Sequence, residues 1–366
     1  MSLLAGAAAF FGALLLAAAL RTHYYRWAAP RLGPATEGEP TTVLLPVRNE
    51  ESNVAECLAT LLAQTASPRV RVIDDSSTDR TAEIVREIQA REPRLELVEA
   101  GELPPGWRGK VHALEVGSQG VETPWILSTD ADTRHHPELL ARVHATVRER
   151  QLDALSIAGF QEARGLGENL LTPAVFALLD ALLGDWRRVA SGESTLANGQ
   201  FILVRRAALE AIGGFEAIRN KPLDDVALAI QLREKGIRNG FLRAPEMLRV
   251  RMYRGLGEAF RGWRRNLGGL SRGRPGQLAV LLGLLLVPPI LLLLAIARGD
   301  WTAAAVAWVS GTAASVLFRS SSSHTVWTGL LYPVDSVLLA ACLGLGWSDY
   351  RRGRLASWKG REMPLG

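Results

Sequence analysis

Apolar residues are concentrated at the two ends of this 366-residue chain. Residues 2–20 are almost wholly apolar, and residues 278–347 hold three apolar blocks, at 278–297, 301–318 and 326–347. A helix needs about 20 apolar residues to cross the hydrocarbon core of a bilayer. The middle of the chain has the mixed composition of a water-soluble domain. We therefore expect a membrane-bound protein in which transmembrane segments flank one soluble domain.

The expected organisation has five parts. They are an N-terminal transmembrane anchor (1–22), a soluble domain (41–253), a basic amphipathic helix at the membrane surface (254–274), two or three transmembrane segments (278–347) and a basic tail (348–366). A further segment, residues 170–189, is apolar on most sides but interrupted and short for a crossing. It is interpreted as a core helix or as a helix lying against the membrane.

The charges beside the apolar segments indicate how the chain is oriented. Positive residues follow the first apolar segment, whereas a cleaved signal peptide carries them before it, so we expect an uncleaved anchor. By the positive-inside rule the soluble domain is then cytoplasmic, in a multi-pass protein of the plasma membrane or cell inner membrane. Three further full crossings would place the basic tail outside, against the same rule. A re-entrant or interfacial block is therefore an alternative to a third crossing.

The net charge of +5 is unevenly distributed, because residues 243–274 contain nine arginines and two glutamates. A basic band next to membrane segments favours anionic lipid headgroups or phosphates as partners. Nucleic acid is disfavoured, because the band carries apolar residues at helical spacing over residues 256–270. The two cysteines, Cys57 and Cys342, are far apart, which excludes a disulfide framework and a cysteine-based zinc site.

Short apolar strands alternate with helical stretches through the middle of the chain. We expect strands at residues 42–47, 69–74, 95–98, 125–128, 154–160 and 200–204, and helices at 51–62, 79–90, 110–117, 137–150, 206–211 and 223–235. Strands separated by helices of this length pair in parallel, which predicts a layered α/β fold. Ligands of such sheets lie beyond the carboxyl ends of the strands.

Two acidic pairs fall at such strand ends. Asp74 and Asp75 end one predicted strand, and Asp130 and Asp132 follow another. Two carboxylates one residue apart can hold Mg²⁺ or Mn²⁺, which prefers oxygen ligands and leaves positions for substrate phosphates. A solvated turn is the alternative for the second pair. The histidine pair that begins at His135 is interpreted as solvated, in preference to a third metal ligand.

Seven short motifs occur in order between residues 41 and 270. They are Pro46-Val47-Arg48-Asn49-Glu50-Glu51, Asp74-Asp75-Ser76-Ser77-Thr78-Asp79, Gly106-Trp107-Arg108-Gly109-Lys110, Asp130-Ala131-Asp132, Asn198-Gly199-Gln200, Leu223-Asp224-Asp225 and Arg261-Gly262-Trp263-Arg264-Arg265. This ordered set resembles family 2 glycosyltransferases of the GT-A fold, which has a Rossmann-like, mostly parallel sheet. The flanking membrane segments make it most similar to the ceramide glucosyltransferase-like and hopanoid- or carotenoid-associated branch.

The resemblance implies a site for a nucleotide-diphosphate sugar, expected to be a UDP-sugar. The turn that contains Pro46, Val47, Arg48 and Glu50 would lie under the nucleotide. Asp75, with Asp74, would accept hydrogen bonds from the base or ribose, since a carboxylate only accepts. Further basic residues would bind the diphosphate or donor sugar, namely Lys110, Arg261, Arg264 and Arg265.

Alternative interpretations exist for these basic residues. Lys110 could be a solvated helix lysine. The three arginines could form a face that binds lipid headgroups, or hold an acceptor phosphate by forked contacts. The family pattern has Trp at the position of Arg265, which is a departure on the acceptor side.

The resemblance also implies the chemistry. Asp132 would bind the divalent metal directly, and Asp130 would assist or support the ribose or a metal-bound water. Asp225, preceded by Asp224, would act as the general base for the acceptor hydroxyl. The favourable effect of acids at a helix N-terminus is the structural alternative for this pair. The acceptor side would be shaped by Asn198, Gly199 and Gln200.

The function expected from the sequence is that of a membrane-bound inverting glycosyltransferase with a lipid acceptor of hopanoid, carotenoid, ceramide-like or polyprenyl type. Two other functions are weighed. A processive polysaccharide synthase would need more membrane spans and the missing Trp. A non-enzymatic membrane scaffold is disfavoured because Asp75, Asp132 and Asp225 are all present.

Overall fold

The computed structural model describes residues 2–221, 223–268, 270, 275–321, 324–353, 355–358 and 361–364. Parts of two predicted segments, at residues 269 and 271–274 and in the tail beyond residue 353, lie outside the described residues or side chains. The chain forms two compact units. The first, which we call the helical unit, contains residues 1–28, 162–184 and 252–366; the second, the sheet unit, contains residues 29–161 and 185–251.

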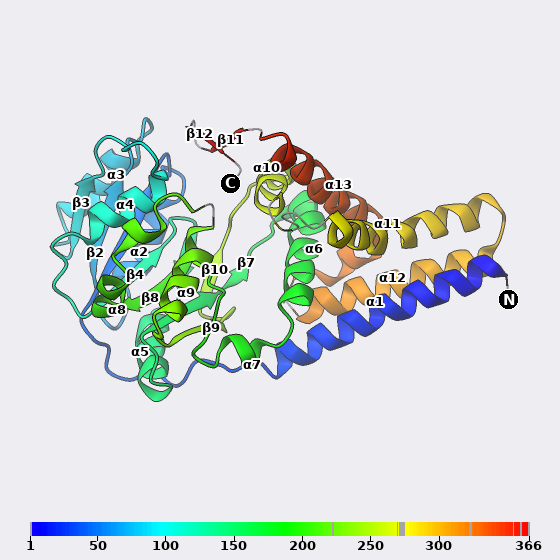
Figure 1. Cartoon of the computed structure of the whole chain (residues 1–366), viewed down its shortest axis with the longest axis horizontal. Coiled ribbons are helices and arrows are strands. Elements are labelled where there is room, and N and C mark those ends of the chain that lie inside the picture. The colour runs from blue at the N-terminus through cyan, green and yellow to red at the C-terminus, as the bar shows by residue number, and fades with distance from the viewer. Residues whose placement is uncertain are drawn as a thin grey trace. The chain divides into compact units, whose positions relative to one another are not determined.

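A seven-stranded sheet is the centre of the sheet unit (Figure 1). Its strands are β1 (Thr41–Val47), β2 (Arg69–Asp74), β3 (Leu95–Glu99), β4 (Trp125–Thr129), β6 (Ala154–Ala158), β8 (Phe201–Arg205) and β9 (Asn239–Arg243), in the order β3-β2-β1-β4-β8-β6-β9. Every pairing is parallel except those of β8, which runs antiparallel to both β4 and β6. The predicted α/β fold with a mostly parallel sheet is confirmed.

Helices cover this sheet, as the alternating pattern predicts. They are α2 (Val54–Leu62), α3 (Thr81–Gln89), α4 (Gly109–Ser118), α5 (Leu139–Glu149), α7 (Trp186–Val189), α8 (Arg206–Ala211), η1 (Phe215–Ile218) and α9 (Asp224–Glu234). The strand residues are apolar without alternation because both faces of the sheet are covered. Leu44 and Leu127, for example, are fully buried.

A second, three-stranded sheet was not expected from the sequence. It contains β5 (Thr133–His135), β10 (Leu248–Val250) and β7 (Phe160–Gln161), in the order β5-β10-β7. The prediction of one strand over residues 154–160 is wrong, because the chain passes from β6 in the large sheet to β7 in the small one. Gly159 lies at the transition, where a Cβ atom would lie 2.6 Å from the carbonyl oxygen of Leu248.

The helical unit contains α1 (Leu3–Trp27), α6 (Gly165–Leu183), α10 (Leu256–Leu267), α11 (Pro275–Ala297), α12 (Trp301–Ser321), η2 (Val326–Leu331) and α13 (Tyr332–Arg351), with a hairpin of β11 (Leu355–Trp358) and β12 (Arg361–Pro364). Among the described residues, five helical segments are long and apolar enough to cross a membrane: Leu3–Trp27, Gly165–Leu183, Pro275–Ala297, Trp301–Ser320 and Val326–Arg351. The predicted single segment at 170–189 is divided at Gly184, whose φ of +74° ends α6.

Small residues let α1 and α12 pack closely. Ala5 and Ala8 of α1 are buried in one cluster with Ala303, Ala304 and Ala307 of α12. A Cβ atom on Gly12 would overlap the side chain of Ser310. Close approach through small residues is the usual way in which transmembrane helices associate, because lipid provides no hydrophobic driving force between them.

This packing predicts that Gly12→Leu destabilises the helical unit, whereas Ala13→Leu, at the neighbouring exposed position, does not. Overpacking of a close contact typically costs about 1–3 kcal/mol. Thermal unfolding of both variants in detergent checks the prediction. Equal unfolding temperatures for the two variants would contradict the close α1–α12 contact.

Candidate active site

The acidic residues singled out in the sequence lie at one edge of the large sheet. Val47 at the end of β1 pairs with Asp74 at the end of β2, and β4 runs parallel beside β1. Because β8 is antiparallel, its first residue, Phe201, pairs with Thr129 at the end of β4. The carboxyl ends of three strands therefore meet the start of a fourth, and this edge collects most of the predicted site.

The turn after β1 is held against the turn after β2. Arg48 donates through its guanidinium to the carbonyl oxygens of Asp75 and Ser76, the second at 3.2 Å. The backbone N–H of Asn49 donates to Ser77 Oγ at 3.0 Å. Asn49 and Ser76 adopt left-handed backbone conformations, with φ of +52° and +57°. These contacts fix the shape of the segment that starts at Pro46 and Val47.

Three predicted nucleotide-side carboxylates have different surroundings. Asp74 accepts a hydrogen bond from the Ser77 N–H at 3.1 Å, which caps its own turn. Asp75 is 3% exposed, and its N–H donates to the Val47 carbonyl at 2.9 Å. Glu50 accepts from Asn53 Nδ2 at 2.9 Å, near the start of α2.

Lys110 brings together carboxylates that are distant in the sequence. Its Nζ lies 2.6 Å from Asp130 Oδ1 and 3.8 Å from Asp224 Oδ2. Burial by itself would lower the pKa of Lys110, but the charges of Asp130, Asp224 and Asp225 outweigh it and hold the pKa above its usual range. Lys110 is therefore ionised, and its side chain, 21% exposed, is not that of a solvated helix lysine.

Asp225, in the first turn of α9, accepts hydrogen bonds from two backbone N–H groups. Its Oδ2 accepts from Gly199 at 2.9 Å and its Oδ1 from Val226 at 2.8 Å. Burial raises the pKa of Asp225 to about 6, and the neighbouring charge of Asp224 adds to this effect, while Lys110 opposes it. The result is a carboxylate that accepts protons more readily than an ordinary aspartate but is still mainly ionised at neutral pH.

The segment before β8 connects this carboxylate to the sheet. Gly199 donates to Asp225, and a Cβ atom at Gly199 would lie 2.9 Å from Lys110 Nζ, so a larger residue would push the ammonium away. Asn198 Nδ2 donates to Gln200 Oε1 at 2.9 Å, and Gln161 Nε2 donates to the same oxygen at 2.8 Å. The predicted acceptor-side residues are thus close to the predicted base.

Asp130 and Asp132 supply two carboxylates, the type of ligand that Mg²⁺ and Mn²⁺ prefer. Within the described part of the chain, no group of three or more His, Cys, Asp or Glu side chains could hold a metal ion. Mg²⁺ is commonly bound by one or two carboxylates together with substrate phosphates, so two carboxylates suffice. In this structure the positive charge beside the Asp130 carboxylate is the ammonium group of Lys110.

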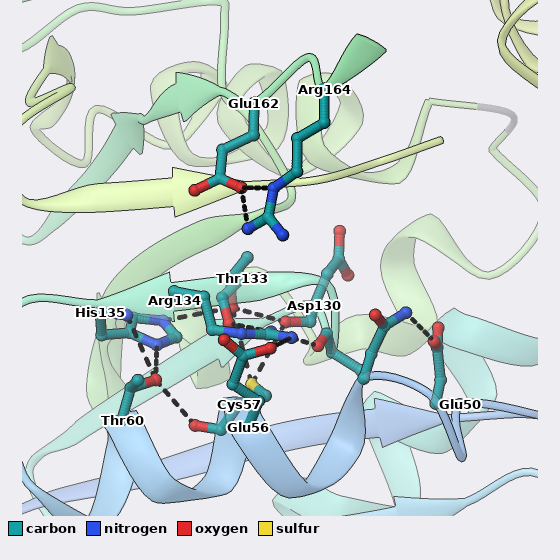
Figure 2. Close-up of polar contacts among 12 residues, drawn as sticks. Glu50, Glu56, Cys57, Thr60, Asp130, Thr133, Arg134, His135, Glu162 and Arg164 are labelled. Atoms are coloured by element: carbon teal, nitrogen blue, oxygen red, sulfur yellow. Dashed lines mark hydrogen bonds and ion pairs between the residues drawn. The ribbon is translucent and has the colours of Figure 1, made fainter. Parts of the chain in front are cut away.

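The interpretation of His135 as a solvated residue is wrong. His135 is 5% exposed, and its Nε2 lies 3.1 Å from Thr129 Oγ1. Thr129 Oγ1 donates to the Gln200 carbonyl at 2.7 Å, so it accepts from His135 Nε2–H. Burial lowers the pKa of His135 to about 3, which keeps the ring neutral. Figure 2 shows His135 beside Thr60 of α2 and Thr133.

Further polar contacts support the loop that carries Asp130. Thr133 Oγ1 donates to the Asp130 carbonyl at 2.6 Å, and the thiol of Cys57 lies 3.7 Å from the same oxygen (Figure 2). Burial raises the pKa of the Cys57 thiol to about 12, so Cys57 is a protonated, unreactive residue of the interior. Sequence reasoning missed these supports because Thr, His and Cys carry no periodic signal at these positions.

The three predicted arginines belong to α10 of the helical unit. Arg264 Nε lies 2.6 Å from Asp349 Oδ2 of α13, so this arginine already has a carboxylate partner. Arg261 is exposed and Arg265 is half-buried. Trp263 is buried against Phe176 and Tyr253, which gives the apolar face of α10 a well-packed interior.

Comparison with known proteins identifies the family. The family model described as "Glycosyltransferase like family 2" matches residues 39–269, which is more than half of the chain. The chain belongs to this family. The resemblance drawn from the seven motifs is thereby confirmed.

Curated relatives include proteins whose names specify lipid-related substrates. A 4,4'-diaponeurosporenoate glycosyltransferase of Staphylococcus haemolyticus is 32% identical over 126 residues, 33% of each chain. A beta-monoglucosyldiacylglycerol synthase of Synechocystis is 30% identical over 230 residues, 58% of this chain and 45% of that protein. The chain thus spans less than half the length of these two relatives. A diaponeurosporenoate glycosyltransferase of Staphylococcus aureus is 24% identical over 362 residues, 88% of each chain.

A solved structure has the same fold over most of its length. It is a mannosyltransferase from Pyrobaculum calidifontis in complex with GDP-Man and Mn²⁺, with a TM-score of 0.55 and 22% identity. The match covers 92% of this chain and 99% of that one. At this level of identity the likeness establishes the GT-A fold.

The raised pKa of Asp225 leads to a prediction about stability. A carboxyl whose pKa is higher in the folded than in the unfolded state reduces stability as the pH rises from the ordinary value of 3.8 through about 6. Asp225→Asn is therefore expected to unfold at an equal or higher temperature than the parent at pH 7.5, and to lose this advantage toward pH 4.5. Thermal unfolding at both pH values is the measurement, with Asp153→Asn at the exposed Arg205 ion pair as control. A large drop in unfolding temperature at pH 7.5 would contradict the assigned shift.

Proposed function

We propose that this chain is a membrane-bound inverting glycosyltransferase that moves a sugar from a nucleotide-diphosphate sugar to the hydroxyl of a lipid. The observation that carries the proposal is the placement of Asp225 beside Gly199, Lys110 and the Asp130–Asp132 segment. This transfer needs a carboxylate that can accept the proton of the acceptor. It also needs positive charge near the diphosphate, which an ammonium group and a metal ion held by two carboxylates would supply. Family membership and the lipid-related relatives support the same conclusion.

On the donor side, Asp75 is proposed to accept hydrogen bonds from the base or ribose, with Asp74 shaping the turn. The segment that contains Pro46, Val47, Arg48 and Glu50 would lie under the nucleotide. The donor is proposed to be a UDP-sugar. The Pyrobaculum neighbour was solved with GDP-Man, and competition between UDP and GDP for binding tests which base this chain prefers.

Asp132, assisted by Asp130, is proposed to hold Mg²⁺ or Mn²⁺ together with the donor diphosphate. The Mn²⁺ in the Pyrobaculum structure supports a divalent ion. A bound divalent cation would neutralise the charge that develops on the leaving diphosphate. Lys110 would add a second positive charge to the same oxygens. Arg261 and Arg265 of the helical unit are proposed to bind the phosphates of lipid headgroups.

Asp225 is proposed to remove the proton from the acceptor hydroxyl as that oxygen attacks the anomeric carbon and the bond to the diphosphate breaks. A pKa of about 6 suits this role, because the base is ionised at neutral pH and still basic enough to take a proton. Asp224 keeps the pKa of Asp225 raised through its negative charge. Asn198, Gly199 and Gln200 would shape the acceptor side.

The acceptor is proposed to be a lipid and the sheet unit to be cytoplasmic, in the plasma membrane or cell inner membrane. Two relatives are a 4,4'-diaponeurosporenoate glycosyltransferase and a beta-monoglucosyldiacylglycerol synthase, and both names specify lipid-related molecules. The apolar helices of the helical unit would retain the protein in the same membrane as such an acceptor. Incubation of membranes with labelled nucleotide sugars, followed by lipid extraction and mass analysis, tests this. Label found only in a water-soluble polymer would overturn the lipid acceptor.

The role of Asp225 predicts the effect of replacing it. Asp225→Asn should lower the turnover number by about 10²–10⁴-fold, because a positioned general base contributes that much. In the parent, the turnover number should be constant above about pH 6 and fall about tenfold per pH unit below it, as the base becomes protonated. Nucleotide binding by the variant, measured by calorimetry, should be unchanged. Equal turnover in the variant would refute the assignment of the base.

The buried imidazole predicts a second, separable effect. His135→Phe keeps an aromatic ring but removes the N–H that Thr129 accepts, so the Asp130 loop should hold the metal and donor less well. A lost hydrogen bond of about 1.4 kcal/mol corresponds to about a tenfold rise in the metal concentration needed for half-maximal activity. His136→Phe, at the exposed neighbouring position, is the matched control. A change in turnover number with no change in metal requirement would contradict a positioning role.

A further inference from the structure

Contacts between the helices of the helical unit indicate which of them cross the membrane. α1 and α12 run in the same direction, side by side. Ser2 hydrogen-bonds Asp300 at their starts, Gly12 lies against Ser310 midway, and Arg26 donates to the Phe318 carbonyl at 3.2 Å near their ends. We call the end that holds Arg26, where the chain continues into the sheet unit, the inner end. The opposite end, with Ser2 and Asp300, is the outer end.

α11 runs opposite to α12 and is joined to it at the outer end. Leu292 and Ala295, late in α11, share a cluster with Ala303 early in α12. The first turns of α11 therefore belong to the inner end. α1, α11 and α12 contain 25, 23 and 21 residues, which at about 1.5 Å per residue is at least 30 Å each and enough to cross.

The chain before α6 and the chain after it lie in the same unit, which is not expected of a helix that crosses a membrane. The residues before and after it, up to 161 and from 185, belong to the same sheet unit. A crossing would place those two parts on opposite sides of the membrane. Its contacts agree: Asp180 pairs with Arg26, and the Asn169 carbonyl accepts from Arg319 at 3.1 Å. α6 thus spans the inner ends of α1 and α12 (Figure 1).

α13 begins partway along α12 and not at either end. The Tyr332 hydroxyl donates to the Ala307 carbonyl at 3.0 Å, and a Cβ atom on Gly311 would overlap the Tyr332 ring. Three residues later, Asp335 Oδ2 lies 2.8 Å from the Arg319 guanidinium, close to the inner end of α12. α13 therefore starts at middle depth and runs toward the inner end, in the same direction as α12.

The far end of α13 stays at the inner end. Leu339, Cys342 and Leu343 cluster with Leu278 in the first turns of α11. Arg264 of α10 pairs with Asp349, and Gly346 packs directly against the α10 backbone. Because α10 directly follows the sheet unit in the chain, this places the last turn of α13 on the same side as the sheet unit.

Two buried charged residues, Arg319 and Asp335, link α12 to α13. Arg319 is 2% exposed and donates to Asp335, to Thr328 Oγ1 of η2 at 2.9 Å and to Asn169. Backbone that is not α-helical is tolerated at membrane depth only where protein buries it, and Thr328 and Gly329 are buried against α12. Ionised residues within apolar segments are costly unless they are paired, and Arg319 and Asp335 are paired with each other.

We propose that only α1, α11 and α12 cross the bilayer, and that η2 and α13 form a re-entrant element that returns the C-terminal end to the side of the sheet unit. α6, α10 and the end of α13 then form a layer at the inner boundary of the membrane. The basic tail no longer lies outside, which removes the conflict with the positive-inside rule.

The inner layer has the charge expected of a surface that faces anionic headgroups. Arg261 of α10 and Arg351 and Arg352 at the end of α13 are exposed on it. Each basic side chain near an anionic membrane surface contributes about 1 kcal/mol of attraction. The proposed partner of this layer is therefore the anionic lipid of one leaflet.

Single cysteines test the topology in the full-length protein. Both native thiols are buried and are replaced by alanine to give a cysteine-free parent. Arg352→Cys reports the end of α13, Arg91→Cys the sheet unit and Arg298→Cys the outer turn, all at exposed positions. With a membrane-impermeant maleimide, Arg352→Cys is expected to label in the same vesicle orientation as Arg91→Cys and in the opposite one to Arg298→Cys. Labelling of Arg352→Cys together with Arg298→Cys would overturn the proposal.

A second measurement tests the role of the buried ion pair. Arg319→Ala leaves Asp335 without its arginine and is expected to lower the unfolding temperature and to make labelling of Arg352→Cys less one-sided. Arg319→Met combined with Asp335→Leu removes both charges, and should recover one-sided labelling, since removing a whole buried pair costs less than breaking it. Unchanged one-sidedness and stability in the single variant would show that the pair does not hold the re-entrant element.

Discussion

The ionised Lys110 side chain is the interaction on which the site depends. It lies among three carboxylates, Asp130, Asp224 and Asp225, which come from a strand end and from the start of a helix. Without a cation between them, these acids would repel one another at close range. Gly199 leaves the space that the ammonium needs and also donates to Asp225. One partly buried positive charge therefore connects the proposed base, the metal pair and the acceptor segment.

The helical unit also pairs each buried positive charge with a carboxylate, here among apolar helices. Arg26 and Arg319 are buried, and each is paired with an aspartate from a different helix, Asp180 and Asp335. An unpaired charge within an apolar helix is costly in free energy, so it pairs with an opposite charge. The pair then determines which helix lies beside it. In this unit the two ion pairs join α6 to α1 and α13 to α12.

Much of the fold and part of the site could be predicted from the sequence. The apolar strands predict a parallel sheet, and Asp74, Asp75, Asp130 and Asp132 lie next to those strands, so their shared edge follows from strand direction alone. The prediction for His135 is wrong, because a histidine beside charged residues looks solvated unless its contact with Thr60 of the distant helix α2 is known. The small sheet of β5, β7 and β10 was missed since strands of two or three residues carry no periodic signal.

The sequence by itself determined the family, the α/β class and the segments apolar enough to cross a membrane, because these depend on residues that are adjacent or periodic along the chain. Only the tertiary structure decided which charges meet. Lys110 forms ion pairs with Asp130 and Asp224, and Arg319 pairs with Asp335, which follows η2 in the chain. Local patterns report whether a segment can be a strand or a membrane helix, and not how deep it starts or what it pairs with. Those properties depend on packing between segments that are distant in the chain.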